Sequence, residues 1–189
     1  MHKKPFLLIS AIVSAVALCG IMVWMITDRA AILRDGREVV LKTEPIDPRD
    51  LLRGRYVRLN YAISRVPPIT FTGEKPDYFD NGTTIYVRLE QGADGFWQAA
   101  EARVGSRPDD GDIWIRGETL YRMASTDNPA NVSYGIERFY AAEALAPEIE
   151  KRMRLGDVTE VVVAVATDGR AQIKALRQAG NTIFTERLY

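Results

Sequence analysis

A long charge-free segment near the start of the chain constrains its structure more than any other feature. Residues Phe6–Ile26 carry no charged side chain, and they match the roughly 20 apolar residues that a helix needs to cross the hydrocarbon core of a bilayer. Trp24, near one end, suits the aromatic belt at a membrane interface. No other run in the chain is comparable, so the sequence predicts a single-pass protein that contacts the lipid bilayer through residues 6–26.

The same segment differs from a cleaved signal peptide. It is longer than the apolar region of about 7–15 residues that such peptides carry, and neither Ala30 nor Ala31 has a small residue two positions before it. A lipoprotein signal would use Cys19, but the bulky Leu18 stands where a small residue is needed. We therefore expect the segment to stay attached as a signal anchor.

The charges that flank the segment bear on its orientation. Lys3 and Lys4 favour a cytoplasmic N-terminus, whereas Arg29, Arg34 and Arg37 on the other side argue the opposite. Long domains translocate largely regardless of charge, so we expect a protein of the cytoplasmic (inner) membrane with a periplasmic or otherwise extracytoplasmic C-terminal domain. The predicted organisation is a cytoplasmic head and anchor at 1–27, a stalk and first strand at 28–42, and the β-rich domain at 43–189.

Apolar and polar residues alternate along most of the remaining chain, which is typical of half-buried strands. The alternation predicts strands at 37–43, 55–61, 83–90, 96–104, 113–120, 132–140 and 170–176, with a short edge at 186–189. Residues 158–166 are nearly all apolar and β-branched, and this run predicts a central strand. Asp94-Gly95 and Asp168-Gly169 predict hairpin turns, and residues 147–155 predict one helix that ends at Gly156. The expected fold class is mainly β (α+β): a single transmembrane helix, then an antiparallel β-rich domain, sandwich or partly closed barrel, with one short helix.

The stretch from Thr43 to Tyr61 is the densest in residues with special backbone demands. Asp47 is placed to cap a short helical turn that begins at Pro48, and Gly54 is expected to end that turn with a positive φ. Leu59 and Tyr61 then share one face of a strand. One interpretation is a capped turn that feeds a core strand; the other is a surface site made by Asp47, Arg49, Asp50 and Tyr56.

Three stretches resemble the GDYXXLXY family of membrane-anchored bacterial proteins: Gly54–Tyr61, which reads Gly-Arg-Tyr-Val-Arg-Leu-Asn-Tyr, the preceding Pro45–Leu51, and Tyr134-Gly135-Ile136-Glu137. The resemblance implies membrane placement and architecture, and it implies no activity. Arg55 stands where the family has an acid, so a function that needed that acid would be missing or compensated here. The motif residues that could bind a partner are Asp47, Arg49, Asp50, Gly54, Tyr56, Leu59, Tyr61, Gly135 and Glu137.

The residue inventory excludes several kinds of chemistry from the domain. His2 is the only histidine and Cys19 the only cysteine, and both precede the domain, so histidine triads and His/Cys zinc sites are not expected there. A P-loop and a dinucleotide glycine fingerprint are absent, and the formal net charge of +0 provides no general basic field for nucleic acid. The acidic run 109–112 lacks the spacing of an EF-hand loop. We therefore predict no cofactor, no metal and no assigned catalytic residue.

Two classes of function remain open. The first is a non-enzymatic protein-interaction module whose partner is another membrane protein. The second is a cell-envelope hydrolase or peptidase-like enzyme that uses carboxylates or a Ser/Lys pair. Glu137 is the most notable isolated acid: if it is buried, it needs a partner such as Arg49, Arg53 or Arg55, and otherwise it faces solvent. Spacing selects no pair from Ser64, Ser106, Ser125 and Ser133 with Lys42, Lys75, Lys151 and Lys174.

Overall fold

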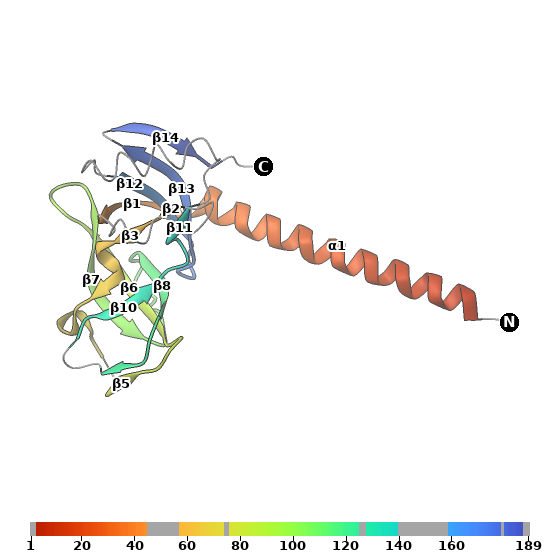
Figure 1. Ribbon diagram of the computed structural model, residues 1–189, viewed down its shortest axis with the longest axis horizontal. Coiled ribbons are helices and arrows are strands. Elements are labelled where there is room, and N and C mark those ends of the chain that lie inside the picture. The colour runs from red at the N-terminus through yellow and green to blue at the C-terminus, as the bar shows by residue number, and fades with distance from the viewer. Residues whose placement is uncertain are drawn as a thin grey trace.

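The computed structural model describes residues 3–44, 57–73, 76–124, 128–139, 159–178 and 180–186. One long helix, α1 (Lys3–Asp35), projects from a β-rich domain (Figure 1). Its part from Ser10 to Asp35 is long and apolar enough to cross a membrane, and Trp24 is 67% exposed on it. The predicted apolar helix is therefore present, with the length of a membrane anchor or a signal sequence, and it continues without a break through the predicted stalk.

The first sheet combines strands from the first third of the chain with strands from its C-terminal part. Its order is β14 (Asn181–Thr185), β13 (Ala171–Gln178), β12 (Thr159–Val165), β1 (Arg37–Glu44) and β3 (Asn60–Tyr61), and all its neighbours pair antiparallel. All five residues of β12 from Val161 to Val165 are buried. The apolar run that predicted a central strand is thus confirmed, because β12 lies between two strands and also packs against α1.

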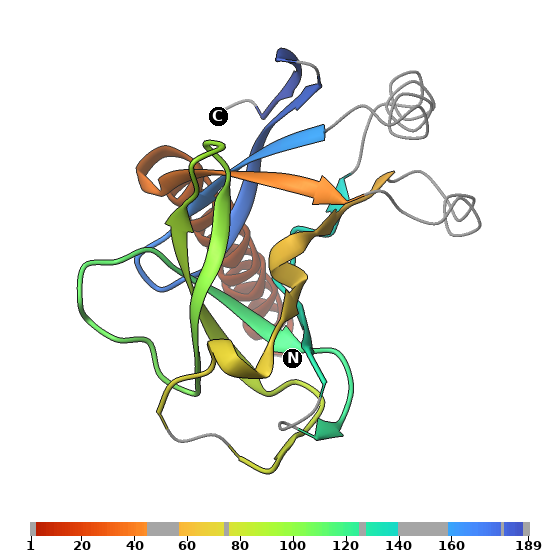
Figure 2. The same cartoon turned by 90° about the vertical axis from the view of Figure 1, so that its left-hand side faces the viewer.

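The second sheet is built from the middle of the chain. Its order is β4 (Arg65–Val66), β10 (Ala130–Ser133), β8 (Trp114–Thr119), β6 (Thr84–Gln91) and β7 (Trp97–Val104). Two-stranded ribbons join β2 (Val57–Arg58) to β11 (Arg138–Phe139) and β5 (Tyr78–Phe79) to β9 (Met123–Ala124). Short 3-10 turns, η2 (Ala62–Ser64) and η3 (Pro68–Thr70), flank β4. Figure 2, which views the domain with α1 behind it, shows both sheets, and the expected mainly β class with antiparallel sheets is confirmed.

The described residues of the two sheets share a hydrophobic core. Val39 and Leu41 of β1 belong to the same buried cluster as Ile85 and Val87 of β6, although the two strands lie in different sheets. Ile85, Val87 and Leu89 are the alternating apolar residues of the strand predicted at 83–90, and all three are buried. The hydrophobic effect is roughly proportional to the apolar area removed from water, so this shared burial is what holds the sheets together.

Two predicted strands differ from the structure within the described residues. The described part of 55–61 is divided into β2 and β3, which pair with different strands. The segment 132–140 is divided into β10 and β11, because Gly135 has a positive φ of 77° that ends the extended backbone. Of the predicted edge at 186–189, Glu186 follows the edge strand β14 (Asn181–Thr185), and residues 187–189 lie outside the described residues.

Trp114 is buried although it alternates along β8 with the exposed Arg116 and Glu118. It is only 1% exposed. The indole Nε1 of Trp114 donates to Asp110 Oδ1 at 2.9 Å, so the acidic loop covers the ring. The predicted turn at Pro48, the φ of Gly54 and the helix at 147–155 lie outside the described residues.

Candidate functional site

The two described segments that resemble the family lie side by side. The Leu59 N–H donates to the Glu137 carbonyl at 2.8 Å, and β2 pairs with β11 through Arg58 opposite Arg138 and Val57 opposite Phe139. The turn that begins at Tyr134 is therefore attached to the strand that ends at Tyr61. We call this contact, made by Leu59, Tyr61, Ile63, Tyr134, Ile136 and Glu137, the motif joint.

Two buried tyrosine hydroxyls cross the motif joint in opposite directions. The Tyr61 hydroxyl donates to the Ile136 carbonyl at 2.8 Å, and the Tyr134 hydroxyl donates to the Ile63 carbonyl at 2.6 Å. Burial, reinforced by the negative charge of the nearby Glu137 carboxylate, raises the pKa of both hydroxyls above the ordinary tyrosine value. Both tyrosines are therefore neutral donors at ordinary pH.

The Glu137 side chain folds back on its own turn. Its carboxylate accepts the Tyr134 backbone N–H and, at 3.0 Å, the Ser133 hydroxyl. The side chain is half-buried, and these donors supply partners that a partly desolvated carboxylate needs. The three arginines that the sequence suggested as partners, Arg49, Arg53 and Arg55, lie outside the described residues.

The structure describes only some of the candidate motif residues. Leu59 and Tyr61 are core residues, 0% and 1% exposed, while Gly135 is exposed at the surface and Glu137 holds the turn. These residues are brought together at the motif joint. The remaining motif candidates, Asp47, Arg49, Asp50, Gly54 and Tyr56, lie outside the described residues, and their binding role stays a prediction.

A second joint fixes α1 to the first sheet. Arg170, directly before β13, donates from both terminal nitrogens to the Asp28 carboxylate and from Nε to Asp168 at 2.6 Å. Arg29 Nε donates to Gln172 Oε1 at 2.9 Å. Ile32 and Leu33 are buried, 6% and 5% exposed. We call this contact of Asp28, Arg29, Ile32 and Leu33 with Arg170 and Gln172 the anchor joint.

Gly36 lets the chain turn directly from α1 into β1 at the anchor joint. Its N–H donates to the Ile32 carbonyl at 2.9 Å. A Cβ at this position would lie 2.4 Å from the same carbonyl oxygen and 3.2 Å from the Cβ of Ala164 in β12. The close approach of the helix end to β12 therefore requires glycine here.

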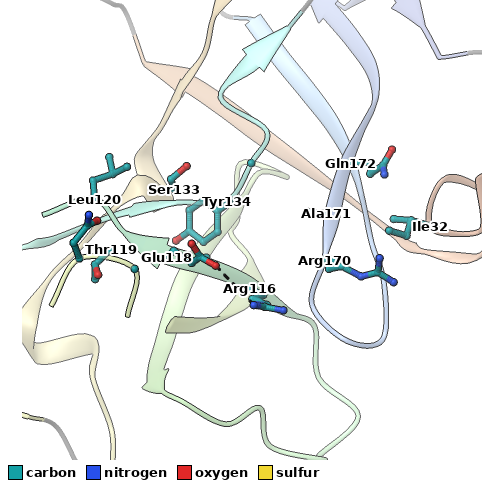
Figure 3. Close-up of a pocket in the computed structure, with 14 residues that line it drawn as sticks. Ile32, Arg116, Glu118, Thr119, Leu120, Ser133, Tyr134, Arg170, Ala171 and Gln172 are labelled. Atoms are coloured by element: carbon teal, nitrogen blue, oxygen red, sulfur yellow. Dashed lines mark ion pairs between the residues drawn. The ribbon is translucent and has the colours of Figure 1, made fainter. Parts of the chain in front are cut away.

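A cleft of about 540 Å³, the β8 cleft, opens beside the anchor joint. In Figure 3, Arg116 and Glu118 from the second sheet and Tyr134, which follows β10, lie on one side, and Ile32, Arg170 and Gln172 lie on the other. Arg116 and Glu118 are two positions apart on β8 and point to the same side. The nearest nitrogen–oxygen distance between their side chains is 3.8 Å, and they are 42% and 58% exposed.

A neighbouring cleft of about 390 Å³, the β11 cleft, shares Gly135, Ala171 and Gln172 with the first. Arg29, Arg138 and Glu186 also line it. Gly135 has open space where a Cβ would stand, so the motif turn presents bare backbone to both clefts. A third pocket, about 280 Å³, lies on other elements, where Lys42 Nζ is 5.8 Å from the ring centre of Phe96.

The acidic loop is explained by its internal contacts. Asp110 accepts hydrogen bonds from the Trp114 indole and from the Asp112 backbone N–H, and the Trp114 bond is the largest cause that lowers the pKa of Asp110. Within the described ranges, no group of three or more His, Cys, Asp or Glu side chains is arranged to hold a metal ion.

The described contacts of Ser133, Lys174 and Ser64 do not pair a serine with a lysine. The Ser133 hydroxyl donates to Glu137, and Lys174 Nζ donates to Glu38 at 2.7 Å. The Ser64 hydroxyl oxygen is buried without a hydrogen-bond partner among the residues that the structure describes. These contacts give no observation in favour of a serine–lysine mechanism.

Sequence reasoning did not single out Arg116, Glu118, Arg170 or Gln172. They come from two regions far apart in the sequence, β8 and the beginning of β13, and each looks like an ordinary outward-facing polar residue of a strand or a hairpin. The one available signal was that Arg116 and Glu118 share the solvent face of β8. That signal is common to most half-buried strands, so only the tertiary arrangement identifies the clefts.

Comparisons with known proteins concern the family alone. Neither the curated proteins nor the solved structures include a match to this chain. The model of the GDYXXLXY protein family matches residues 18–176, which include the C-terminal part of α1, both motif segments and strands of both sheets. The chain therefore belongs to the GDYXXLXY family.

Proposed function

We propose that this protein is a single-pass inner-membrane protein whose β-rich domain lies outside the cytoplasm and binds another membrane protein. In this proposal α1 is the anchor and the domain is a non-enzymatic interaction module. The observation that carries it is the anchor joint. The apolar helix runs without interruption into the domain and is attached there by the paired Asp28 and Arg170 and by the buried Ile32 and Leu33.

A domain held in this way would have a fixed orientation at the membrane. A flexible linker would let every face of the domain reach solvent or partners. A helix that packs on β12 and β13 instead keeps one face of the domain toward the bilayer. Partners that lie in the same membrane would meet that face and its rim, which supports a membrane protein as the partner.

Exposed apolar side chains mark a place for such a contact. Leu120, which lines the β8 cleft, is 45% exposed and the adjacent Tyr121 is 60% exposed. Neighbouring exposed apolar residues are typical of protein–protein contact surfaces, where tyrosine is enriched. We therefore assign the rim of the β8 cleft at Leu120 and Tyr121 as the contact region of this proposal.

The proposal is tested first for placement. A reporter that is active only in the cytoplasm, fused after Tyr189, is expected to be inactive, and the protein is expected to stay in membranes after an alkaline wash. An active reporter would contradict the orientation, and release by the wash would contradict the anchor.

Partner binding is tested by photocrosslinking in intact cells. A photoreactive residue at Tyr121 is expected to form a discrete adduct with a protein that itself resists alkaline extraction. The matched control is Ala93, an exposed residue in the turn between β6 and β7. Figure 1 shows this turn on the side of the domain away from α1. Equal adducts from both positions, or none from Tyr121, would contradict the assignment.

A further inference from the structure

The depth of the anchor joint places the two clefts close to lipid headgroups, if α1 crosses the membrane as proposed above. An α-helix rises about 1.5 Å per residue, so Arg29 lies roughly 4.5 Å and Ile32 roughly 9 Å beyond Ile26, the last residue of the charge-free run. The headgroup layer on each side of the hydrocarbon core is about 5–8 Å thick. Arg29 lines the β11 cleft and Ile32 lines the β8 cleft, so both clefts begin within or next to this layer.

The arginines that line the clefts are not equivalent. Arg170 is occupied, because its guanidinium binds the carboxylates of Asp28 and Asp168, and it serves the anchor joint. Arg116 is bound less tightly: its guanidinium is 3.8 Å from the Glu118 carboxylate, which is longer than a hydrogen bond. A guanidinium has five N–H donors in a planar fork that fits phosphate oxygens.

Arg116 and Glu118 together present one positive and one negative group on the same face of β8. A phosphoethanolamine headgroup carries the same two charges, a phosphate and an ammonium. Arg116 can donate to the phosphate while Glu118 accepts from the ammonium, and both contacts are of the strong, charge-assisted kind. Ile32 of α1 lines the same cleft and places an apolar side chain on the side from which the glycerol and first acyl carbons would come.

We propose that the β8 cleft binds the headgroup of a phosphoethanolamine lipid of the surrounding membrane, with Arg116 on the phosphate and Glu118 on the ammonium. This site goes beyond the proposed protein interaction and rests only on its membrane-anchoring part. A bound lipid would make the cleft part of the membrane interface, with Leu120 and Tyr121 beside it for the protein partner.

The test is native mass spectrometry of the full chain in detergent micelles that contain a phosphatidylethanolamine, a phosphatidylglycerol or a phosphatidylcholine. Phosphatidylethanolamine is expected to be retained most strongly. All three lipids carry the phosphate, but only phosphatidylethanolamine has an ammonium whose N–H groups can donate to Glu118. Arg116→Gln is expected to weaken phosphatidylethanolamine retention about tenfold, the effect of losing one charge-assisted contact. Glu118→Gln is expected to remove the preference over phosphatidylcholine.

The matched control is Arg65→Gln. It removes the same charge from an exposed residue that lines the third pocket, and it is expected to leave lipid retention unchanged. Equal retention by the wild type and Arg116→Gln, or equal loss in Arg65→Gln, would overturn the site. Free phosphoethanolamine that competes as well as the lipid would also overturn it, because the ligand would then be soluble. A protein that resists alkaline extraction but fails these tests refutes the lipid site and leaves the anchor standing.

Discussion

The motif joint and the anchor joint both hold distant parts of the chain together, but they are built from different interactions. The motif joint uses neutral hydroxyls of Tyr61 and Tyr134 that donate to backbone carbonyls inside the core. The anchor joint uses exposed ion pairs of Arg170, which is 45% exposed, together with the buried Ile32 and Leu33. Breaking a buried hydrogen bond leaves an unpaired polar group and is costly, whereas exposed ion pairs contribute little and are screened by salt.

From this difference we expect the motif joint to stabilise the fold and the anchor joint to orient the domain. The motif joint is part of the core, so its loss should lower the stability of the whole domain. The anchor joint lies at the edge of the domain, so its loss should leave the fold intact and free the domain to move relative to α1. The family resemblance at the motif joint is then explained by folding, while the orientation of the domain depends on side chains outside those motif segments.

The largest expected effect is alkaline destabilisation of the motif joint. The folded-state pKa values of Tyr61 and Tyr134 are raised, so their stabilising contribution is complete below the unfolded value of about 10 and is lost as pH rises. Each buried tyrosine should lower the free energy of unfolding by about 1.4 kcal/mol per pH unit above that value. Urea unfolding in detergent between pH 9 and pH 11 (about one unit on either side of the ordinary tyrosine pKa) measures this slope.

The double variant Tyr61→Phe/Tyr134→Phe serves as the control for this slope. It has no hydroxyl to ionise at either position, so its stability should fall less steeply with pH than that of the wild type. The same slope in both proteins would show that other groups cause the alkaline loss.

The second-largest expected effect is the loss of stability when each hydroxyl is removed at neutral pH. Tyr134→Phe leaves the Ile63 carbonyl without its donor, and Tyr61→Phe does the same to the Ile136 carbonyl. Each change should reduce the free energy of unfolding by about 1–3 kcal/mol. Tyr121→Phe is the matched control, because Tyr121 is 60% exposed, and it should be nearly neutral. Equal losses of stability at the buried and the exposed tyrosines would contradict the claim that the buried hydroxyls stabilise the motif joint.

The smallest effect is expected at the anchor joint. Arg170→Gln removes the ion pairs with Asp28 and Asp168 and should cost at most about 1 kcal/mol of stability, less at high salt. It should nevertheless broaden the distance distribution between spin labels on α1 and on the domain. A stability loss as large as that of Tyr134→Phe, or an unchanged distance distribution, would contradict the claim that the anchor joint orients the domain and contributes little to its stability.

Sequence patterns predicted the local parts of this fold well. The Asp94-Gly95 and Asp168-Gly169 turns join β6 to β7 and β12 to β13 with a positive φ at each glycine. Period-two alternation identified the long strands, since one face of each packs on the core. The uninterrupted apolar run identified α1. Each of these patterns could be read correctly because it is complete within one segment of the chain.

The remaining features depend on contacts between distant segments. Gly135 interrupts a convincing alternation because its neighbours Tyr134 and Ile136 turn to meet Ile63 and Tyr61. Trp114 is buried because Asp110 reaches its indole. The β8 cleft needs α1, β8 and β13 at once, and the β11 cleft needs α1, β11 and β13. No pattern within one segment encodes such an arrangement. The candidate site was therefore predictable at Leu59, Tyr61, Gly135 and Glu137 as motif residues, and not at Arg116 or Glu118.

The central claim is that α1 holds the cleft side of the domain against the membrane, and paramagnetic relaxation measures this most directly. Single cysteines replace Gln172, which binds Arg29 at the anchor joint, and Ala93 in the turn away from α1; both variants carry Cys19→Ser to remove the native cysteine. Each is spin-labelled and reconstituted in nanodiscs whose lipids carry nickel-chelating headgroups. Strong relaxation at position 172 and weak relaxation at position 93 is the expected result, and equal relaxation at the two positions would contradict the claim.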